Sequence, residues 1–210
     1  MKDDFSLFIS ALSERFTGPL PGTSAHKKLE PASRKKYPEM KDYSKVKISS
    51  VLMLLFPVNN RPKIVFIQRQ KYNGVHSGQI SFPGGSHEKT DKSDVETALR
   101  ETSEEIGVPV QTIKIIGKLS ELYIPPSSFL VHPFVGYVDE MPKFVPDPKE
   151  VHEVFTVDLA KLASEQTFKY RIVEVQNYSQ IVPCFFIDNR LIWGATAMML
   201  NELIEITNSF

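Results

Sequence analysis

The sequence has a single cysteine, no long apolar run and no net charge. Cys184 is the one cysteine among 210 residues, so no disulfide bond can form within them. A lone cysteine fits a reducing compartment. Its apolar surroundings in VPCFFI favour a small core residue over a nucleophile. Any chemistry must therefore come from other residue types.

Charge and hydrophobicity exclude further classes of protein. The 25 basic residues balance the 25 acidic ones, so the whole molecule has no field that would attract nucleic acid or an anionic membrane. A local basic patch stays open. No window approaches the roughly 20 apolar residues of a membrane span. The start, MKDDFSLFISALSERF, lacks the features of a signal peptide. We expect no nucleic-acid partner, no membrane partner and a cytoplasmic location.

The length allows one well-buried domain and an extension. We assign residues 1–45 to an N-terminal helix and extended segment, and residues 46–210 to the main domain. The first helix has one apolar face, formed by Phe5, Phe8, Ile9, Leu12 and Phe16. The segment 18–43 is rich in proline and lysine, which predicts an extended linker. Its basic cluster, Arg34 to Lys36, indicates solvated surface, although contact with an anionic substrate is open.

The main domain alternates strand-like and helix-like stretches. KISSVLMLLFPV (47–58) and KIVFIQRQ (63–70) are apolar, β-rich runs, and residues 59–62 between them predict a hairpin or a short loop. SGQISFPGG ends in a Pro-Gly-Gly turn, and a helix follows from about Ser93 to Ile106. Ser93 or Asp94 is its expected N-cap, and Gly107 is its expected C-terminal stop. Further strands are expected at 113–124, 129–138, 168–175 and 180–189, a strand leading into a short helix at 150–163, and a closing helix at 190–207. The pattern predicts an α/β fold with a mixed sheet between helices.

The stretch RETSEEIGV, residues 100–108, gathers three like charges near the end of the predicted helix. At about 100° per residue, Glu101 and Glu105 lie side by side at the edge of the buried face, and Glu104 lies one step further round. Arg100 and Glu104 are four residues apart and can pair. Like charges at this spacing are destabilising, and the helix dipole also disfavours anions at a C-terminal end.

A divalent cation would reverse that cost, since Mg²⁺ and Mn²⁺ prefer carboxylate oxygens together with water and substrate phosphate. A solvated acidic face is the alternative. The preceding turn, Phe82-Pro83-Gly84-Gly85, changes the balance, because glycines let the backbone approach a ligand closely. A glycine-rich loop before an acidic helix can hold both a metal ion and a diphosphate.

The stretch GGSHEKTDKSDVETALRETSEEIGV resembles the Nudix box, G-x5-E-x7-R-E-U-x-E-E-x-G-U, where U is aliphatic. The second half of the box matches at Arg100, Glu101, Glu104, Glu105, Gly107 and Val108. This resemblance implies a Nudix-like α/β/α sandwich. It also implies Mg²⁺- or Mn²⁺-dependent cleavage of a diphosphate, with the metal ions held by the acidic helix.

The sequence departs from the box at two points. Thr102 occupies an aliphatic position, and Lys92 stands where the pattern has its first glutamate. One residue has been added before Arg100, and Asp91 lies next to the displaced position, with Glu88 and Asp94 nearby. The first acidic residue of the box therefore stays unassigned.

The variant spacing resembles the coenzyme A diphosphatase branch, whose upstream motif is L-L-T-x-R-[SA]-x3-R-x3-G-x3-F-P-G-G. Arg69, Gly78 and the FPGG turn match it, whereas Ile67, Gln70 and Gly74 depart from it. The downstream stretch 192–197 and the layout of 125–138 and 150–162 are also similar to that branch. The resemblance covers roughly residues 46–205 and implies coenzyme A as the substrate.

These observations predict a set of site residues. The catalytic residues would be Glu101, Glu104, Glu105 and Arg100; the metal ligands Glu101, Glu105, Glu104 and the Gly84 carbonyl; the substrate-binding residues Arg69, Gly84 and Gly85. Arg100 would orient a glutamate, and Arg69 could grip phosphate or be a surface arginine at a strand end. The general base is open among Glu150, Glu153 and a glutamate of the box.

Other polar and aromatic residues carry weaker alternatives. His76, His132 and His152 are widely separated, and no cysteine partners them, which argues against a zinc site. Trp193 and Thr196 are expected to pack the last helix. Tyr72, Tyr123 and Phe129 either stack an adenine or belong to the core.

The sequence leads to three alternative functions that experiments can distinguish. The first is hydrolysis of coenzyme A or acyl-coenzyme A to 3′,5′-ADP and phosphopantetheine. The second is hydrolysis of another nucleoside diphosphate derivative, such as ADP-ribose or a dinucleotide, which the departure at Gly74 favours. The third is a non-catalytic nucleotide sensor, against which the three intact glutamates argue. A homodimer formed through the N-terminal helix is open.

Overall fold

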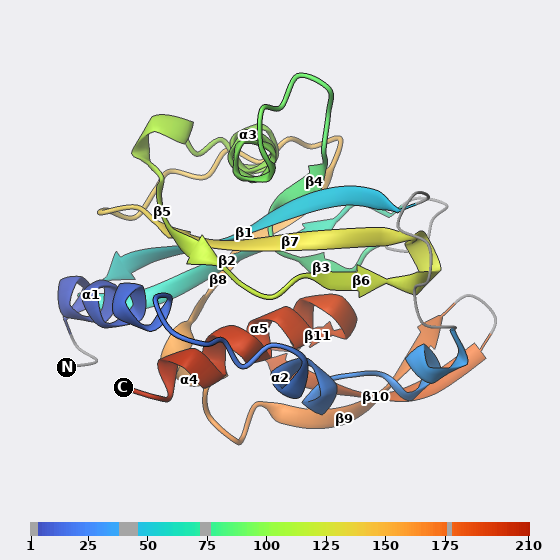
Figure 1. The fold of residues 1–210 in the computed structure, drawn as a ribbon. Helices are drawn as coiled ribbons and strands as arrows, with labels where there is room; N and C mark the ends of the chain where they lie inside the picture. The colour runs from blue at the N-terminus through green and yellow to red at the C-terminus, as the bar shows by residue number, and fades with distance from the viewer. Residues whose placement is uncertain (1–3, 38–45, 72–76, 176–177) are drawn as a thin grey trace.

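The computed structural model describes residues 4–37, 46–71, 77–175 and 178–210 (Figure 1). The described residues form an eight-stranded sheet with the order β3-β2-β1-β7-β5, in which β4 pairs with β1, β6 with β7 and β8 with β2. The strands are β1 (Lys47–Val58), β2 (Arg61–Arg69), β3 (Ile80–Ser81), β4 (Gly84–Ser86), β5 (Lys114–Lys118), β6 (Leu122–Ile124), β7 (Phe129–Tyr137) and β8 (Val151–Asp158). The pair β1–β7 is parallel and the others are antiparallel, so the sheet is mixed, as predicted.

Helices cover both faces of this sheet (Figure 1). Helix α3 (Asp94–Ile106) lies on one face, and α5 (Gly194–Thr207) lies on the other. The central strand β1 alternates accordingly: Leu52 and Leu54 join the cluster beneath α3, whereas Met53 and Leu55 join the cluster with α5. Because both faces of β1 are covered, the strand is apolar on both sides. The predicted α/β/α sandwich is confirmed.

A second sheet lies beyond α5 (Figure 1). It consists of β9 (Phe168–Val175), β10 (Tyr178–Ile187) and β11 (Arg190–Trp193), in the order β11-β10-β9. The remaining short elements are η3 (Val110–Thr112), η4 (Pro125–Ser127) and α4 (Leu159–Leu162). Cys184 is buried in β10, in agreement with its predicted place in the core.

Two turns explain where local prediction succeeded and where it failed. Asn59 and Asn60 have positive φ values of 50° and 63°, and they join β1 to β2 as a tight hairpin, as predicted. Asp188 and Asn189 adopt the same conformation, with φ of 48° and 60°. This second turn folds 190–193 back onto β10 as strand β11. The prediction of one helix over 190–207 is therefore wrong at its start.

Two further predictions also change. The expected single strand over 113–124 is two strands, β5 and β6. It breaks at Ser120, whose N–H and hydroxyl both turn to the carboxylate of Glu202 instead of a neighbouring strand. The expected turn at Gly84-Gly85 is strand β4, because these residues pair with Ser50 and Val51 of β1.

The N-terminal residues are more ordered than predicted. Helix α1 (Phe5–Arg15) buries the expected apolar face in the cluster that also contains α5. The segment expected to be extended instead forms α2 (Thr23–Lys28) and the 3₁₀ helix η1 (Ala32–Lys36); its last residues, 38–43, lie outside the described residues. The reason is packing on α5, where the Asn201 amide donates to the Ala25 carbonyl at 2.9 Å. A chain division at residue 45 and a homodimer stay predictions.

In the described part of the chain, no helix combines the length and apolarity that crossing a bilayer requires.

Candidate active site

Helix α3 is fixed at both ends by the predicted residues. The Ser93 side chain accepts a hydrogen bond from the Glu96 N–H at 3.3 Å and caps the N-terminus. Gly107 follows the helix with φ of 72°, a left-handed conformation that glycine adopts at low cost. The face of α3 that packs on the sheet includes the fully buried residues Ala98, Thr102 and Ile106. The glutamates lie beside this face, on the side of the helix toward β4.

The two glycines of β4 meet two of these glutamates. The Gly84 N–H donates to Glu105 Oε2 at 2.8 Å. A Cβ atom on Gly85 would lie 2.4 Å from the carboxyl carbon of Glu101, and one on Gly84 would lie 2.3 Å from the Ser50 carbonyl oxygen. A larger residue at Gly84 would collide with the backbone of β1, and one at Gly85 would displace the Glu101 carboxylate. The glycine-rich strand and the acidic helix therefore form one site, as the sequence predicted.

The Glu105 carboxylate is buried with little compensating charge. The side chain is 2 % exposed, and burial raises the pKa of Glu105 to about 8. The Gly84 N–H and the Arg69 guanidinium, whose nearest nitrogen lies 3.6 Å away, favour the charged form, while Glu101 and Glu150 oppose it. Burial also raises the pKa of Glu101, and Arg100 opposes that shift. Arg69 and Arg100 therefore offset only part of the effect of burial on these two carboxylates.

Arg100 is held by several acceptors. Its guanidinium donates to both carboxylate oxygens of Asp91, at 2.9 and 3.0 Å, and to Glu101 at 3.1 Å. It also donates to Glu104 at 2.9 Å, which is the predicted i,i+4 pair, and to the Ser86 carbonyl at 3.1 Å. The bidentate contact with Arg100 lowers the pKa of Asp91. Arg100 therefore ties together the carboxylates of the helix edge and the preceding loop.

Asp91 is the carboxylate that sequence reasoning left unassigned. It is buried, its Oδ2 also accepts from the Thr97 hydroxyl and the Glu88 N–H, and it stands beside the displaced first position of the box. Glu104, in contrast, has a side chain that is 60 % exposed. Asp91 thus makes the buried, bidentate contact with Arg100, and Glu104 lies on the solvent side of the site.

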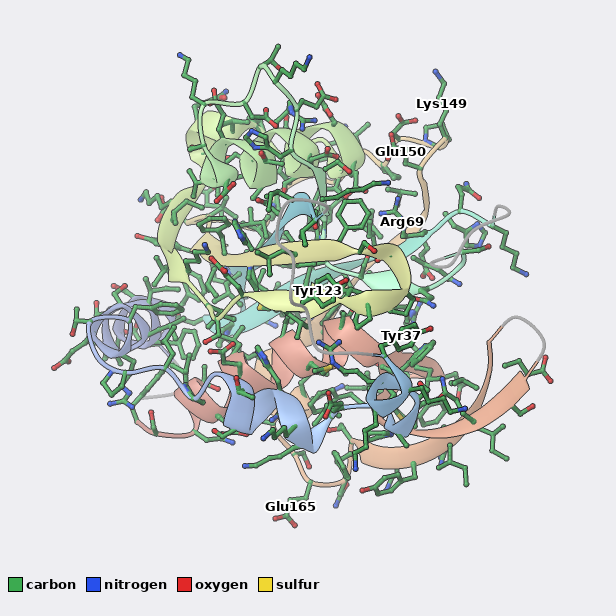
Figure 2. The ribbon with its side chains drawn as sticks, turned by 45° about the vertical axis from the view of Figure 1, so that its right-hand side comes forward. Tyr37, Arg69, Tyr123, Lys149, Glu150 and Glu165 are labelled. Carbon is green, nitrogen blue, oxygen red and sulfur yellow. The ribbon has the colours of Figure 1, made fainter. Side chains whose placement is uncertain are left out.

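The candidate bases differ in their surroundings. Glu150 lies close to Arg69 beside the end of β2 (Figure 2), and its backbone carbonyl accepts from the Gln70 N–H at 2.9 Å. Its charge also acts on Glu101 and Glu105. Glu153 instead forms an ion pair with Arg190 of β11. The geometry brings Glu150 to the site and engages Glu153 elsewhere.

The two described histidines of the candidate zinc set, His132 and His152, lie in different surroundings. His132 is buried in β7, with Nδ1 hydrogen-bonded to Asp94, whereas His152 is exposed on β8. His76 lies outside the described residues, as do Tyr72 and Gly74. Among the residues that the structure describes, no three His, Cys, Asp or Glu side chains stand close enough to hold a metal ion by themselves. A magnesium-type site does not need such a cage, because it commonly uses one or two carboxylates with water and phosphate.

A cavity of about 370 Å³ opens beside Arg69, Gly84 and Gly85. The wall of the cavity includes Phe129, Trp193 and Thr196, which were expected to pack in the core or to stack an adenine. Tyr123 does not line the cavity, but its carbonyl accepts a hydrogen bond from Arg34. Arg34 itself also lines the cavity, and its side chain is 22 % exposed. The prediction of a solvated surface is therefore wrong for Arg34. No local pattern in residues 31–37 could have revealed this, because the wall depends on how η1 docks.

Comparison with known proteins agrees with the site. The model of the NUDIX domain matches residues 47–176. An uncharacterised Nudix hydrolase, NudL, of Photorhabdus laumondii is 32% identical over 154 residues, which cover 72% of this chain and 82% of that protein. NudL of Pectobacterium atrosepticum is 32% identical over 142 residues, covering 68% and 73%.

Two solved structures share the fold at low sequence identity. The Nudix hydrolase RenU of M. smegmatis has a TM-score of 0.55 at 13% identity, with 87% of this chain and 94% of that chain covered. The MutT protein of Methanosarcina mazei Go1 has a TM-score of 0.51 at 17% identity, covering 80% and 100%.

Proposed function

This chain belongs to the Nudix hydrolase family, a family of diphosphatases, and we propose that it hydrolyses the diphosphate of coenzyme A or acyl-coenzyme A with the help of a divalent metal ion. The observation that carries the proposal is the pairing of Glu101 and Glu105 with the Gly84-Gly85 strand. Burial raises the pKa of both carboxyls. A site that concentrates carboxylates and compensates their charge only in part fits a cation.

The donor set suits Mg²⁺ or Mn²⁺. Glu101 and Glu105 would be the first ligands, and Glu104 and the Gly84 carbonyl would complete the protein's share; all are hard oxygen donors. When bound, such an ion would polarise the phosphoryl oxygens, promote ionisation of the attacking water and neutralise the leaving phosphate. Gly85 lets the Glu101 carboxylate lie directly against β4. The cavity beside Gly84 and Gly85 offers space for the diphosphate.

The protein's own residues supply positioning. Arg69 would grip a phosphate oxygen, since its guanidinium faces the site and its buried Nε has no hydrogen-bond partner. Arg100 would orient Glu101 through its hydrogen bond, with Asp91 holding it in place. These roles extend the sequence prediction for both arginines.

Glu150 is the general base that the geometry favours over Glu153. Water would attack one phosphorus, the P–O bond to the bridging oxygen would break, and Glu150 would take the water's proton. The products would be 3′,5′-ADP and phosphopantetheine. A glutamate of the box is the remaining candidate for this role.

The assignment of coenzyme A rests on the upstream motif. Arg69, Gly78 and the FPGG turn keep the spacing of the coenzyme A diphosphatase branch. Gly78 has φ of 66°, and its N–H donates to the Gln70 carbonyl at 3.2 Å, so it closes the loop between β2 and β3. The departures at Ile67, Gln70 and Gly74 favour the second candidate, another nucleoside diphosphate derivative. A non-catalytic sensor is the third.

A hydrolysis panel tests these candidates. Coenzyme A, acetyl-coenzyme A, ADP-ribose and diadenosine polyphosphates would be incubated with Mg²⁺, Mn²⁺ or a chelator, beside Glu105→Gln, and the products read by mass spectrometry. Release of 3′,5′-ADP from coenzyme A, lost with the chelator and in the variant, is the expected result. Cleavage of the other substrates alone would reject coenzyme A. Binding without any cleavage would indicate a sensor.

A further inference from the structure

The cavity beside the glycine strand is built in part by segments outside the matched NUDIX region. Its volume of about 370 Å³ is typical of a ligand pocket. The wall includes Arg34 from η1 and Trp193 from β11, whereas the match covers residues 47–176. Figure 2 shows Arg69 and Tyr37, which both line the cavity, well apart from each other. A ligand with its diphosphate at Arg69 can therefore extend toward η1.

The η1 side of the cavity carries a cation that is already neutralised. Arg34 Nε lies 2.9 Å from Glu30 Oε1, and another nitrogen of the guanidinium donates to the Tyr123 carbonyl. Burial lowers the pKa of Arg34, and Glu30 opposes the shift, although a guanidinium stays charged at neutral pH. An added phosphate here would meet the Glu30 carboxylate. The local charge balance favours an uncharged polar group.

The remaining walls combine apolar surface with unpaired hydroxyls. Phe129, Trp193 and Met198 present apolar surface. Ser81 and Ser127 also line the cavity, and each has a buried hydroxyl oxygen without a hydrogen-bond partner. An unmade buried hydrogen bond costs about 1–3 kcal/mol, so a ligand group that supplies it gains affinity. Alternating methylene and amide groups would match this surface.

We propose that this cavity binds the non-nucleotide arm of the substrate, an extended uncharged chain with amide groups, and that Arg34 is a specificity-determining residue that donates to a carbonyl of that arm. The inference rests on the proposed function for the identity of the arm, which in coenzyme A is pantetheine. It assigns a substrate-reading role to the N-terminal segment, and it places the nucleotide half outside this cavity.

The single tryptophan of the sequence makes the test direct. Because Trp193 lines the cavity, its fluorescence reports binding there without any need for turnover. Pantetheine and 3′,5′-ADP would be titrated separately into the wild-type protein, Arg34→Gln, Ser127→Ala and the control Lys35→Gln. Lys35 lies in the same 3₁₀ helix, is exposed and does not line the cavity.

Pantetheine should change the Trp193 emission, and Arg34→Gln should weaken its binding about tenfold. Ser127→Ala should weaken it less, without loss of stability, because its hydroxyl bonds to nothing in the free protein. Neither variant should alter the affinity for 3′,5′-ADP, and Lys35→Gln should change nothing. Thermal melting of each variant separates lost binding from lost folding.

Two results would overturn the inference. One is an absent response of Trp193 to pantetheine. The other is a loss of 3′,5′-ADP affinity in Arg34→Gln or Ser127→Ala with pantetheine binding intact, which would place the nucleotide half in the cavity. Failure of the proposed function gives a different pattern: pantetheine would bind in an Arg34-dependent way while coenzyme A stays uncleaved in the hydrolysis panel.

Discussion

Glu105 and Glu202 are both buried glutamates, but the protein surrounds their carboxylates in opposite ways. Glu202 in α5 is fully buried, and it accepts from the Ser120 hydroxyl at 2.7 Å and the Gly22 N–H at 3.1 Å; the His26 ring nitrogen lies 2.9 Å away. Burial alone would raise the pKa of Glu202, but the hydrogen bonds from His26 and Ser120 outweigh it and lower the pKa. For Glu105, burial prevails and raises the pKa.

The contrast separates a structural carboxylate, Glu202, from the carboxylate that we propose as a metal ligand, Glu105. Polar groups from two distant parts of the chain, the α2 segment and Ser120, surround Glu202, so its ionised form is stable and it anchors α2 and the β5–β6 connection onto α5. Glu105 has one backbone donor and a guanidinium nitrogen at 3.6 Å. A buried group that folding leaves under-paired is better explained by a ligand than by stability. Four changes would break or sharpen this comparison.

The largest effect is expected from Glu105→Gln. Loss of a metal-binding charge should reduce kcat by about 10³-fold, which corresponds to roughly 4 kcal/mol. Without metal and at neutral pH, the melting temperature should stay equal or rise, because glutamine, like the protonated Glu105 carboxyl, is uncharged and keeps an oxygen for the Gly84 N–H. Activity and melting measured on the same sample check both parts. A strongly destabilised variant would show that Glu105 is structural.

Glu202→Gln should show the reverse. Glu202→Gln removes the carboxylate from a buried hydrogen-bonded pair, which costs about 3–5 kcal/mol, so the melting temperature should fall by roughly 6–20 °C. At a temperature where the variant is folded, kcat should change little, because Glu202 does not line the cavity or contact α3. His26→Gln and the double variant would complete a cycle. Additive effects of the two changes would contradict a coupled His26–Glu202 pair.

The dependence of stability on pH should differ in sign for the two glutamates. In metal-free protein, Glu105 has a folded pKa near 8, above its ordinary value of 4.5, so the folded state binds more protons between these values. Stability from this group is present below about pH 4.5 and is lost as pH rises toward 8. The stability that comes from the lowered pKa of Glu202 is present above about pH 4.5 and is lost as pH falls further.

Denaturant unfolding at several pH values, in the presence of a chelator, measures these slopes. Glu105→Gln should flatten the loss of stability between pH 5 and 8, and Glu202→Gln should reduce the loss on acidification. An unchanged slope in Glu105→Gln would mean that Glu105 is ionised in the free protein, which would weaken the contrast.

The functional member of this comparison was predictable from sequence, because its signals are local. Glu101 and Glu105 are placed by the 3.6-residue period of one helix. The cap at Ser93 and the stop at Gly107 mark the two ends of the same helix. The glycine turn lies close before it in the chain. Even its error was local, since the added residue hid the role of Asp91, which only the bidentate contact with Arg100 reveals.

The structural member could not be predicted in this way. His26 and Glu202 are 176 positions apart, and neither stands in a pattern that marks a pair. The same holds for Arg34, which reaches the Tyr123 carbonyl 89 positions away. Both contacts follow from docking of the N-terminal segment on the core. The proline- and lysine-rich composition of that segment favoured a linker, and packing overrode that preference.

The smallest effect is expected from Lys28→Gln, which tests whether burial makes the difference. Lys28 and Glu205 also join α2 to α5, with a nitrogen–oxygen distance of 3.0 Å, but the lysine side chain is 63 % exposed. Solvent screens such a pair, so its loss should cost less than about 1 kcal/mol and lower the melting temperature by roughly 4 °C at most. If Lys28→Gln melts at as low a temperature as Glu202→Gln, any polar contact between α2 and α5 contributes as much stability as the buried carboxylate does. If Glu202→Gln alone is unstable, the donors around a buried carboxylate are what hold the N-terminal segment, and with it Arg34, against the cavity.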